Sequence, residues 1–399
     1  MAEVFQLPLS PFSLMVPEVQ VAPDDSILVA LNEVRSFSRT LQDLQWTFFA
    51  PDAGLLGAGL EPPRLTLGEG QVFVASVGIL YAVDLATGAP QWQKTIDPNP
   101  NGRLLPPAAY LPAASDGSFP AMVFVTDGVT VLGIRASDGQ TAWSVRPFGG
   151  AEVNLLVSAT AQPARQFPNG VVFVTIDRAE TSNGVSIAGL SPRDGVAHFR
   201  SPSSLNRVTT LPVVTAGRVF FAGLDPIGLP NFPPIRTLFG FELANLGQSP
   251  DRFVLEFPDA RPGAFEAPVA VILGLNENPN EPTFCWTTPA GEFLVQNGRG
   301  PSSTPVPVSL QPPSVPIAYF NDEGEGRAFL VGNTPAGSPF AAGTLIALPI
   351  GTDPQFSFTI LSRLSTAGPT RFNRRQFAAA WVLAVGGGGF VFAFDLNSL

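Results

Sequence analysis

Short apolar runs separated by turn residues fill almost the whole chain. Runs of four to seven residues rich in Val, Phe, Ile and Thr recur, as in Val72–Ala75, Met122–Thr126 and Val171–Thr175. Runs of this length, bounded by Gly, Pro, Asn and Asp, are typical of buried β-strands. No helical periodicity of useful length interrupts them, so the pattern predicts an all-β protein.

A longer unit repeats around these runs. In its clearest copy, residues 79–92, an apolar strand carries the small residue Ala82, a turn carries Asp84 and Gly88, and Trp92 follows. Residues 131–143 give a second copy, and residues 187–199 give a weaker third. Because one copy cannot bury its apolar face alone, the copies must stack on one another.

The small residue in the strand before each turn allows the units to be counted. Alignment places these residues in that position: Ser38, Ala82, Gly133, Gly189, Gly240, Ala347 and Ala393. Successive positions are 44 to 56 residues apart except for a gap of 107, which implies a degenerate unit near residue 294. Eight units of four antiparallel strands predict an eight-bladed β-propeller, or a seven-bladed one if the degenerate unit is not a sheet.

The repeated aromatic and small residues have a steric explanation. The fourth strand of four units carries Trp46, Trp92, Trp143 or Phe199. A Gly or Ala in the preceding strand lets the large aromatic of a neighbouring strand or blade approach the sheet. The acidic-Gly turns supply the positive φ that tight hairpins require. None of these positions needs a ligand.

The two ends of the chain are predicted to meet. The apolar segment Val4–Leu7 precedes the first unit, and the last unit stops after its third strand, residues 390–396. Pairing the first segment as the missing fourth strand would close the ring and remove two exposed sheet edges. We therefore expect one domain, residues 1–399, with residues 1–10 as the closing strand. The approximate blades are residues 11–52, 60–98, 104–149, 150–202, 206–259, 262–298, 312–362 and 368–399.

Composition agrees with a large packed β-domain. The 39 Gly and 42 Pro residues punctuate the strands, while 45% of the residues are hydrophobic and 32 are Phe. The formal charge is −10, Lys94 is the only lysine, and no arginine cluster resembles a surface that follows phosphates. We therefore expect no nucleic-acid binding.

Two segments bear on membranes and export. Residues 377–394 carry no charge over 18 residues, but Gly386–Gly389 in their middle favour two strands joined by a turn over a membrane span. The N-terminus has neither the basic region nor the long apolar region of a secretory signal. The compartment stays open between the cytoplasm, as the default, and a virion or other external assembly.

Residues 81–92 resemble the repeat of the pyrroloquinoline-quinone-type β-propellers, which pairs a Tyr-Ala-Leu-Asp strand and a Thr-Gly turn with a tryptophan. Residues 212–220 resemble the start of the same repeat. About half of the units carry recognisable copies. The resemblance implies an eight-bladed propeller of tryptophan-docked blades. The family includes quinone-dependent dehydrogenases and non-catalytic members, and the chain resembles the non-catalytic ones.

The residues for known propeller chemistry are not found in the sequence. The quinone dehydrogenases use a catalytic Asp, a calcium site and usually an adjacent cysteine pair, whereas Cys285 is the only cysteine here. The only histidine, His198, is predicted to point away from the face of Phe199, and no nucleophile-elbow motif is present. We expect no catalytic residues, no cofactor and no enzyme activity.

Calcium and ligand binding remain alternatives. Residues 276–281 and 321–325 offer oxygen ligands for calcium, but the first segment lacks the acidic density and the turn Gly of a calcium loop, and an exposed charged hairpin tip is the ordinary explanation of the second. Trp286 and Trp381 have no clear place in the repeat and leave carbohydrate recognition open. The alternative function is thus a quinoprotein-like enzyme, or a propeller that binds a small ligand or carbohydrate in its axial funnel.

Long proline-rich loops are the least generic part of the chain. Residues 224–237 and 298–316 form stiff extended loops, which cost little entropy to hold against a partner. Phe232, Phe265 and Phe340 are the candidate anchors, unless these loops only cover blade edges. The predicted function is a non-catalytic protein-interaction or structural scaffold, including a repeated subunit of a larger assembly, that binds a protein partner or itself.

Overall fold

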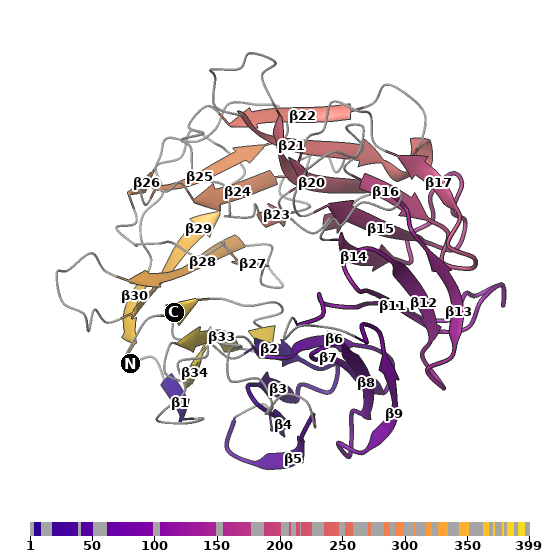
Figure 1. Ribbon diagram of the computed structural model, residues 1–399. Coiled ribbons are helices and arrows are strands. Elements are labelled where there is room, and N and C mark those ends of the chain that lie inside the picture. Colours follow the sequence, from indigo (N-terminus) through magenta and orange to yellow (C-terminus); the bar gives the residue numbers. More distant parts are fainter. Residues whose placement is uncertain are drawn as a thin grey trace. The chain divides into compact units, whose positions relative to one another are not determined.

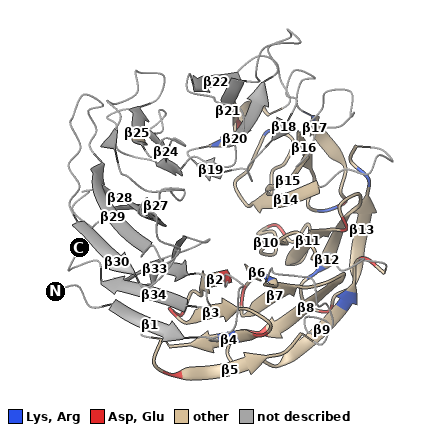
Figure 2. Ribbon diagram, turned by 60° about the vertical axis from the view of Figure 1, so that its left-hand side comes forward, with Lys and Arg blue, Asp and Glu red and all other residues tan. Residues whose placement is uncertain are grey.

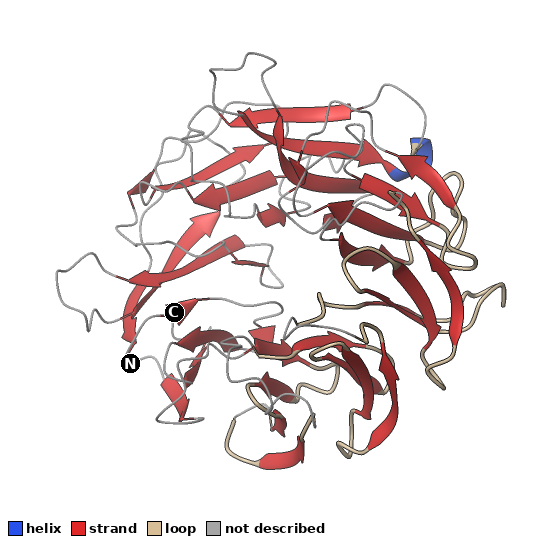
Figure 3. Cartoon of the chain, in the orientation of Figure 1, coloured by secondary structure: helices blue, strands red, loops and turns tan. Residues whose placement is uncertain are grey.

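The computed structural model divides the chain into two compact units. Unit 1 comprises residues 1–47, 60–62 and 267–399, and unit 2 comprises residues 48–59 and 63–266. The structure describes residues 18–38, 41–50, 62–98, 104–148, 155–176, 187–200, 217–225 and 235–246, and elsewhere the strands named below. In this described part the regular secondary structure is entirely β-strand apart from one short 3-10 helix, and turns and loops connect the strands (Figures 1 and 3).

Unit 2 contains four antiparallel sheets, which follow one another along the chain. The first consists of β6 (Arg64–Leu67), β7 (Gln71–Ala75), β8 (Ile79–Asp84) and β9 (Pro90–Thr95). The second consists of β10 (Ala109–Leu111), β11 (Met122–Thr126), β12 (Val131–Arg135) and β13 (Thr141–Val145). The third consists of β14 (Leu155–Thr160), β15 (Val171–Ile176), β16 (Ile187–Leu190) and β17 (Ala197–Arg200). The fourth consists of β18 (Arg207–Val208), β19 (Val213–Thr215), β20 (Arg218–Asp225), β21 (Ile235–Glu242) and β22 (Arg252–Phe257), with the 3-10 helix η1 (Leu243–Asn245) after β21.

Four further sheets contain the strands of unit 1. One consists of β2 (Glu18–Val21), β3 (Ile27–Ala30), β4 (Val34–Phe37) and β5 (Leu44–Phe48). Another consists of β23 (Ala270–Ile272), β24 (Thr283–Thr287), β25 (Glu292–Asn297) and β26 (Val306–Pro307). A third consists of β27 (Ile317–Phe320), β28 (Gly326–Asn333), β29 (Gly343–Ile350) and β30 (Ser362–Thr366). The last combines β31 (Thr370–Arg371), β32 (Phe377–Ala378), β33 (Trp381–Gly386) and β34 (Phe390–Asp395) with β1 (Val4–Pro8).

The register of these sheets repeats. In five sheets a phenylalanine of one inner strand lies opposite the small residue of the next strand: Phe73 opposite Ala82, Phe124 opposite Gly133, Phe173 opposite Gly189, Phe220 opposite Gly240 and Phe329 opposite Ala347. On the other side of the same small residues stands an aromatic of the outer strand in four sheets: Trp92, Trp143, Phe199 and Phe253. In the register the small residue thus lies between two aromatic residues, which explains why its side chain is only a hydrogen atom or a methyl group.

The first unit of the repeat differs from the alignment made on the sequence. Ser38 follows β4 instead of lying within it, and its backbone N–H donates to the carbonyl oxygen of Asp43 at 2.9 Å across the hairpin. Ser36, which is fully buried in β4 and lies opposite Leu28, takes the position inside the strand. The prediction of Ser38 is wrong because this hairpin lacks the Asp-Gly turn on which the alignment of the other units rests.

The core of unit 2 lies between consecutive sheets. Strand β11 is buried along its whole length, and successive residues point to opposite faces of the sheet. Val123 and Val125 pack in a cluster with residues of β7 and β8, whereas Met122 and Phe124 pack in a cluster with residues of β14, β15 and β16. A strand covered on both faces reads as a continuous apolar run, which is why these runs are so clear in the sequence.

The termini and the uncharged segment near the C-terminus form one sheet. Strand β1 pairs antiparallel with β34, and this register places Phe5 opposite Ala393. Strands β33 and β34 pair antiparallel around Gly386–Gly389, as the turn glycines predicted. Within the residues that the structure describes, no helix is long and apolar enough to cross a membrane.

Candidate interaction surface

Trp92 ties its own sheet to the next one in unit 2. Its indole Nε1 donates a hydrogen bond of 2.7 Å to the carbonyl oxygen of Ala136, at the start of the β12–β13 turn. Gly139 in the same turn has a φ of +72°, and a Cβ at this position would lie 2.8 Å from Cε3 of Trp92. The glycine is therefore required twice, by the backbone conformation and by the indole of the preceding sheet.

Trp143 makes the same connection one sheet further on. Its Nε1 donates to the carbonyl oxygen of Pro192 at 2.8 Å, and a Cβ on Gly195 would lie 2.6 Å from its Cε3. A Cβ on Gly133, in the neighbouring strand of its own sheet, would overlap the indole. Trp143 is 8% exposed, so the indole is held between two glycines and a carbonyl group.

The third connection lacks an indole. Phe199 packs edge-on against Phe241 with ring centroids 5.4 Å apart, and a phenyl group has no hydrogen to donate. Leu243 occupies the place of Ala136 and Pro192, three residues after the small residue of its strand, and its carbonyl oxygen accepts from the backbone N–H of Arg165 at 3.1 Å. A hydrogen bond from the backbone of Arg165 thus replaces the bond from an indole, and the carbonyl oxygen at this position has a donor in all three connections.

The acidic residues of the turns bind their own backbone. Asp84 accepts hydrogen bonds from the Thr87 hydroxyl at 2.7 Å and from two backbone N–H groups, and the Thr87 bonds hold the pKa of Asp84 below its ordinary value of 3.8. The Gln140 N–H has the largest effect in lowering the pKa of Asp138, which also pairs with Arg135 at 2.7 Å. These carboxylates stabilise turns.

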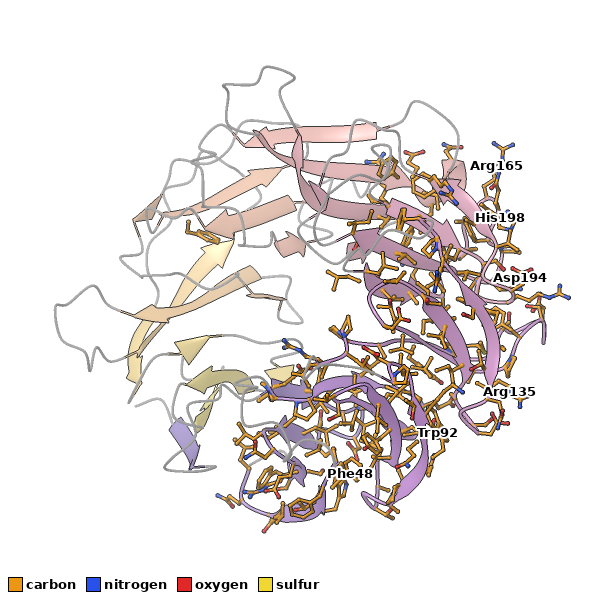
Figure 4. The ribbon with its side chains drawn as sticks, in the orientation of Figure 1. Phe48, Trp92, Arg135, Arg165, Asp194 and His198 are labelled. Carbon is orange, nitrogen blue, oxygen red and sulfur yellow. The ribbon has the colours of Figure 1, made fainter. Side chains whose placement is uncertain are left out.

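Asp194 accepts hydrogen bonds within the turn between β16 and β17. Burial acts to raise the pKa of Asp194, but hydrogen bonds from Ser191 and from the Val196 N–H, with the positive charges of His198 and Arg193, lower it on balance. The carboxylate is therefore charged near neutral pH and is held by its own turn. His198 and Arg193 lie near it on the outside of the same sheet, and Figure 4 shows Asp194 and His198 on this side together with Arg165.

His198 occupies a β-bulge. The register between β16 and β17 pairs Gly189 with Phe199 and Leu190 with Ala197, so His198 is the extra residue. Gln91 and Ala142 are the extra residues at the same place in the two preceding sheets. The His198 side chain is exposed and its ring contacts the edge of Phe167 at a centroid distance of 5.5 Å, while Phe199 is buried. The bulge explains the outward direction of His198 better than strand alternation does.

The structure describes only some of the predicted site residues. Trp46 is buried in β5, and Gly240 and Ala393 lie at the small positions of their sheets. The predicted anchors Phe232, Phe265 and Phe340 lie outside the described residues, as do both calcium candidates. In the part that is described, no group of three or more His, Cys, Asp or Glu residues is placed to hold a metal ion.

Sequence reasoning missed the second role of Gly139 and Gly195. Their positive φ was predicted from the turn pattern, but each also seats a tryptophan from the preceding sheet. The only available signal was the regular recurrence of the tryptophan and the turn glycine in successive units.

Comparison with known proteins identifies the class of the repeat. Residues 30–225 match the family model described as "Outer membrane protein assembly factor BamB", so the repeat in this part of the chain is of the pyrroloquinoline-quinone type, as its resemblance indicated. No curated protein matches the sequence.

Solved structures share the fold at low sequence identity. BamB from Moraxella catarrhalis is 14% identical, with a TM-score of 0.60 over 99% of this chain and 100% of that one. The WD40 domain of SCAP from fission yeast is 10% identical, with a TM-score of 0.54 over 99% and 94% of the two chains. BBS1N, solved in complex with ARL6DN, is 11% identical, with a TM-score of 0.50 over 98% and 95%. The chain is an all-β protein with a β-propeller fold.

Proposed function

We propose that the protein is a non-catalytic β-propeller that acts as a protein-interaction or structural scaffold. The observation that carries the proposal is the docking of Trp92 and Trp143 onto carbonyl groups and glycines of the following sheet. These contacts fix the sheets of unit 2 to one another, so the turns and outer strands on their surface hold set positions. A partner that binds such a preorganised surface loses little free energy to ordering it.

The comparisons support a scaffold. The matching family is described as an assembly factor, and BBS1N was solved with a bound protein. These are properties of the relatives, and we extend to this chain only the general role of binding a protein, either a different partner or a second copy of itself, including use as a repeated subunit of a larger assembly.

We propose eight blades closed into a ring by the N-terminal strand. In support, the described strands form eight antiparallel sheets, and one of them is the sheet β23–β26 around the degenerate sixth unit. Strand β1 pairs with β34 and brings Phe5 opposite Ala393, the relationship that Trp92 has to Ala82. The ring accounts for the pairing of the first and last strands in one sheet.

The absence of enzyme activity and of a cofactor is part of the proposal. Asp84, Asp138 and Asp194 are engaged in their own turns, which accounts for the acidic residues of the repeat without chemistry. With Cys285 as its only cysteine, the chain cannot form the adjacent disulfide that the quinone dehydrogenases usually have, which supports the absence of a quinone site.

The test is the native mass of the purified protein together with whatever co-purifies. A scaffold is expected as a complex with a protein partner or as a homo-oligomer. A monomeric particle that carries stoichiometric quinone absorbance or a tightly bound metal, with no associated protein, would overturn the proposal in favour of a ligand-binding or catalytic propeller.

A further inference from the structure

The β14–β15 connection and the segment 191–200, which holds the β16–β17 turn and β17, are basic although the protein is acidic. The chain carries a formal charge of −10. These two segments, residues 161–170 and 191–200, include three arginines and the only histidine of the chain against one carboxylate, Asp194. We call Arg165, Arg193, His198 and Arg200 the basic patch. Figure 2 shows the wider context, in which charged residues form short patches among long uncharged stretches.

The topology brings these side chains to one end and one edge of the sheet. Thr160 lies opposite Val171, and Val172 lies opposite Leu190, so the β14–β15 connection and the β16–β17 turn leave the same end of the sheet. Arg165 belongs to the first connection and Arg193 to the second. Arg200 lies on β17, the outer strand of the sheet in the described strand order.

Two members of the basic patch are held in place by backbone and ring contacts. Ala164 and Phe167 exchange backbone hydrogen bonds of 2.9 and 2.8 Å, so Arg165 lies in a tight turn whose own N–H is bound to Leu243. The ring of Phe167, 1% exposed, is the surface on which the His198 ring rests. Figure 4 shows Arg165 and His198 projecting from the outer side of this sheet.

The arginines of the basic patch form no ion pair among the described residues. Elsewhere in unit 2, Arg135 pairs with Asp138 at 2.7 Å and Arg218 with Glu242 at 2.8 Å. Among the residues that the structure describes, Arg165, Arg193 and Arg200 form no ion pair, and all three are exposed. Asp194, whose charge interacts with those of Arg193 and His198, accepts the N–H of Val196 at 3.1 Å within its turn.

We infer that the basic patch binds an extended acidic segment of a partner protein. Its carboxylates would pair with Arg165, Arg193 and Arg200, because guanidinium groups present a fork of donors that matches a carboxylate. Val196, 48% exposed beside Asp194, offers the apolar contact between them. The inference rests on the proposed scaffold function and adds the chemistry of the partner.

The direct test uses a fluorescent twelve-residue peptide of alternating Glu and Val, with fluorescence anisotropy at low ionic strength. Binding is expected to weaken by at least about tenfold in the triple variant Arg165→Gln, Arg193→Gln, Arg200→Gln, and in the unchanged protein when salt is raised to roughly 0.5 M. The matched control is Arg135→Gln with Arg146→Gln, which removes two arginines outside the basic patch and should leave the affinity unchanged. Circular dichroism verifies that each variant is folded.

Three results would overturn the inference. The first is that a Gln-Val peptide binds as tightly as the Glu-Val peptide, and the second is that the triple variant binds the Glu-Val peptide as tightly as the unchanged protein does. The third is that the protein binds anionic vesicles or duplex DNA but not the peptide. A native complex whose partner stays bound to the triple variant contradicts the basic patch but leaves the scaffold function intact, whereas a protein without any partner contradicts the scaffold function itself.

Discussion

The indole nitrogen of Trp143 donates a hydrogen bond of 2.8 Å to the carbonyl oxygen of Pro192, 49 residues further along the chain. The bond is buried, and it joins the outer strand of one sheet to the turn of the next. It shows how a repeat without helices or disulfides obtains rigid connections: a large ring supplies packing, and its one polar hydrogen specifies where the ring must lie.

Replacing Trp143 by Phe should destabilise the protein. The ring is largely retained, but the carbonyl oxygen of Pro192 loses its donor in a buried place, at a cost of about 1–3 kcal/mol. Trp92→Phe is the comparison and should cost less, because its hydrogen bond to Ala136 is only partly buried whereas that of Trp143 is buried. Urea unfolding measures both variants, and an equal loss in the two would contradict the role of burial.

Gly195→Ala should cost more free energy of unfolding than Gly117→Ala. Both glycines have a φ near +72°, but a Cβ would meet nothing within 4 Å at Gly117 and would lie 2.6 Å from Trp143 at Gly195. Backbone strain alone is expected to cost about 1 kcal/mol, and the displaced indole adds about 1–3 kcal/mol. Similar unfolding free energies for both variants would show that Trp143 adjusts freely.

Gly133→Ala should push the Trp143 indole outward. The new methyl group would overlap the indole, whereas Ala82 at the same position of the preceding sheet accompanies a Trp92 that is more exposed. The expected results are a red shift of the tryptophan emission and a lower melting temperature. Ala82→Gly is the reciprocal control, which removes a methyl group beside Trp92. An unshifted emission spectrum from Gly133→Ala would argue against contact between the two residues.

Deleting residues 1–10 should lower the melting temperature by at least about 4 °C. The deletion removes β1 and exposes the edge of β34, along which five residues of β1 are paired. Deletion of residues 1–3, which precede β1, is the control and should have little effect. A melting curve that is the same for both deletions would contradict closure by the N-terminal strand.

Acid should weaken the turns. The pKa values of Asp84, Asp116 and Asp138 are lowered in the folded protein by hydrogen bonds from Thr87, Asn169 and the Gln140 N–H, respectively. A lowered folded-state pKa contributes stability that is complete above the ordinary value of 3.8 and is lost as the pH falls through the lowered value. The melting temperature should therefore decline below about pH 4. Asp84→Asn should reduce the slope of this decline, and an unaltered slope would exclude Asp84 as a contributor.

The strands and the repeat can be recognised from the order of the residues alone. The run Val171–Thr175 and the pairs Ala82–Trp92 and Gly133–Trp143 are visible in it, because burial on both faces and steric contact between neighbouring strands constrain residues that lie close along the chain. The wrong choice of Ser38 marks the place where the local turn signal is missing.

The contacts that join the sheets of unit 2 could not be predicted without the folded structure. The carbonyl groups that receive the indoles of Trp92 and Trp143 lie 44 and 49 residues away, and their positions follow from the packing of whole sheets. The basic patch has the same origin, because the ring of His198, the extra residue of a bulge, contacts Phe167 in the turn that carries Arg165. Such contacts depend on the relative placement of distant backbone segments, which no local pattern of residues encodes.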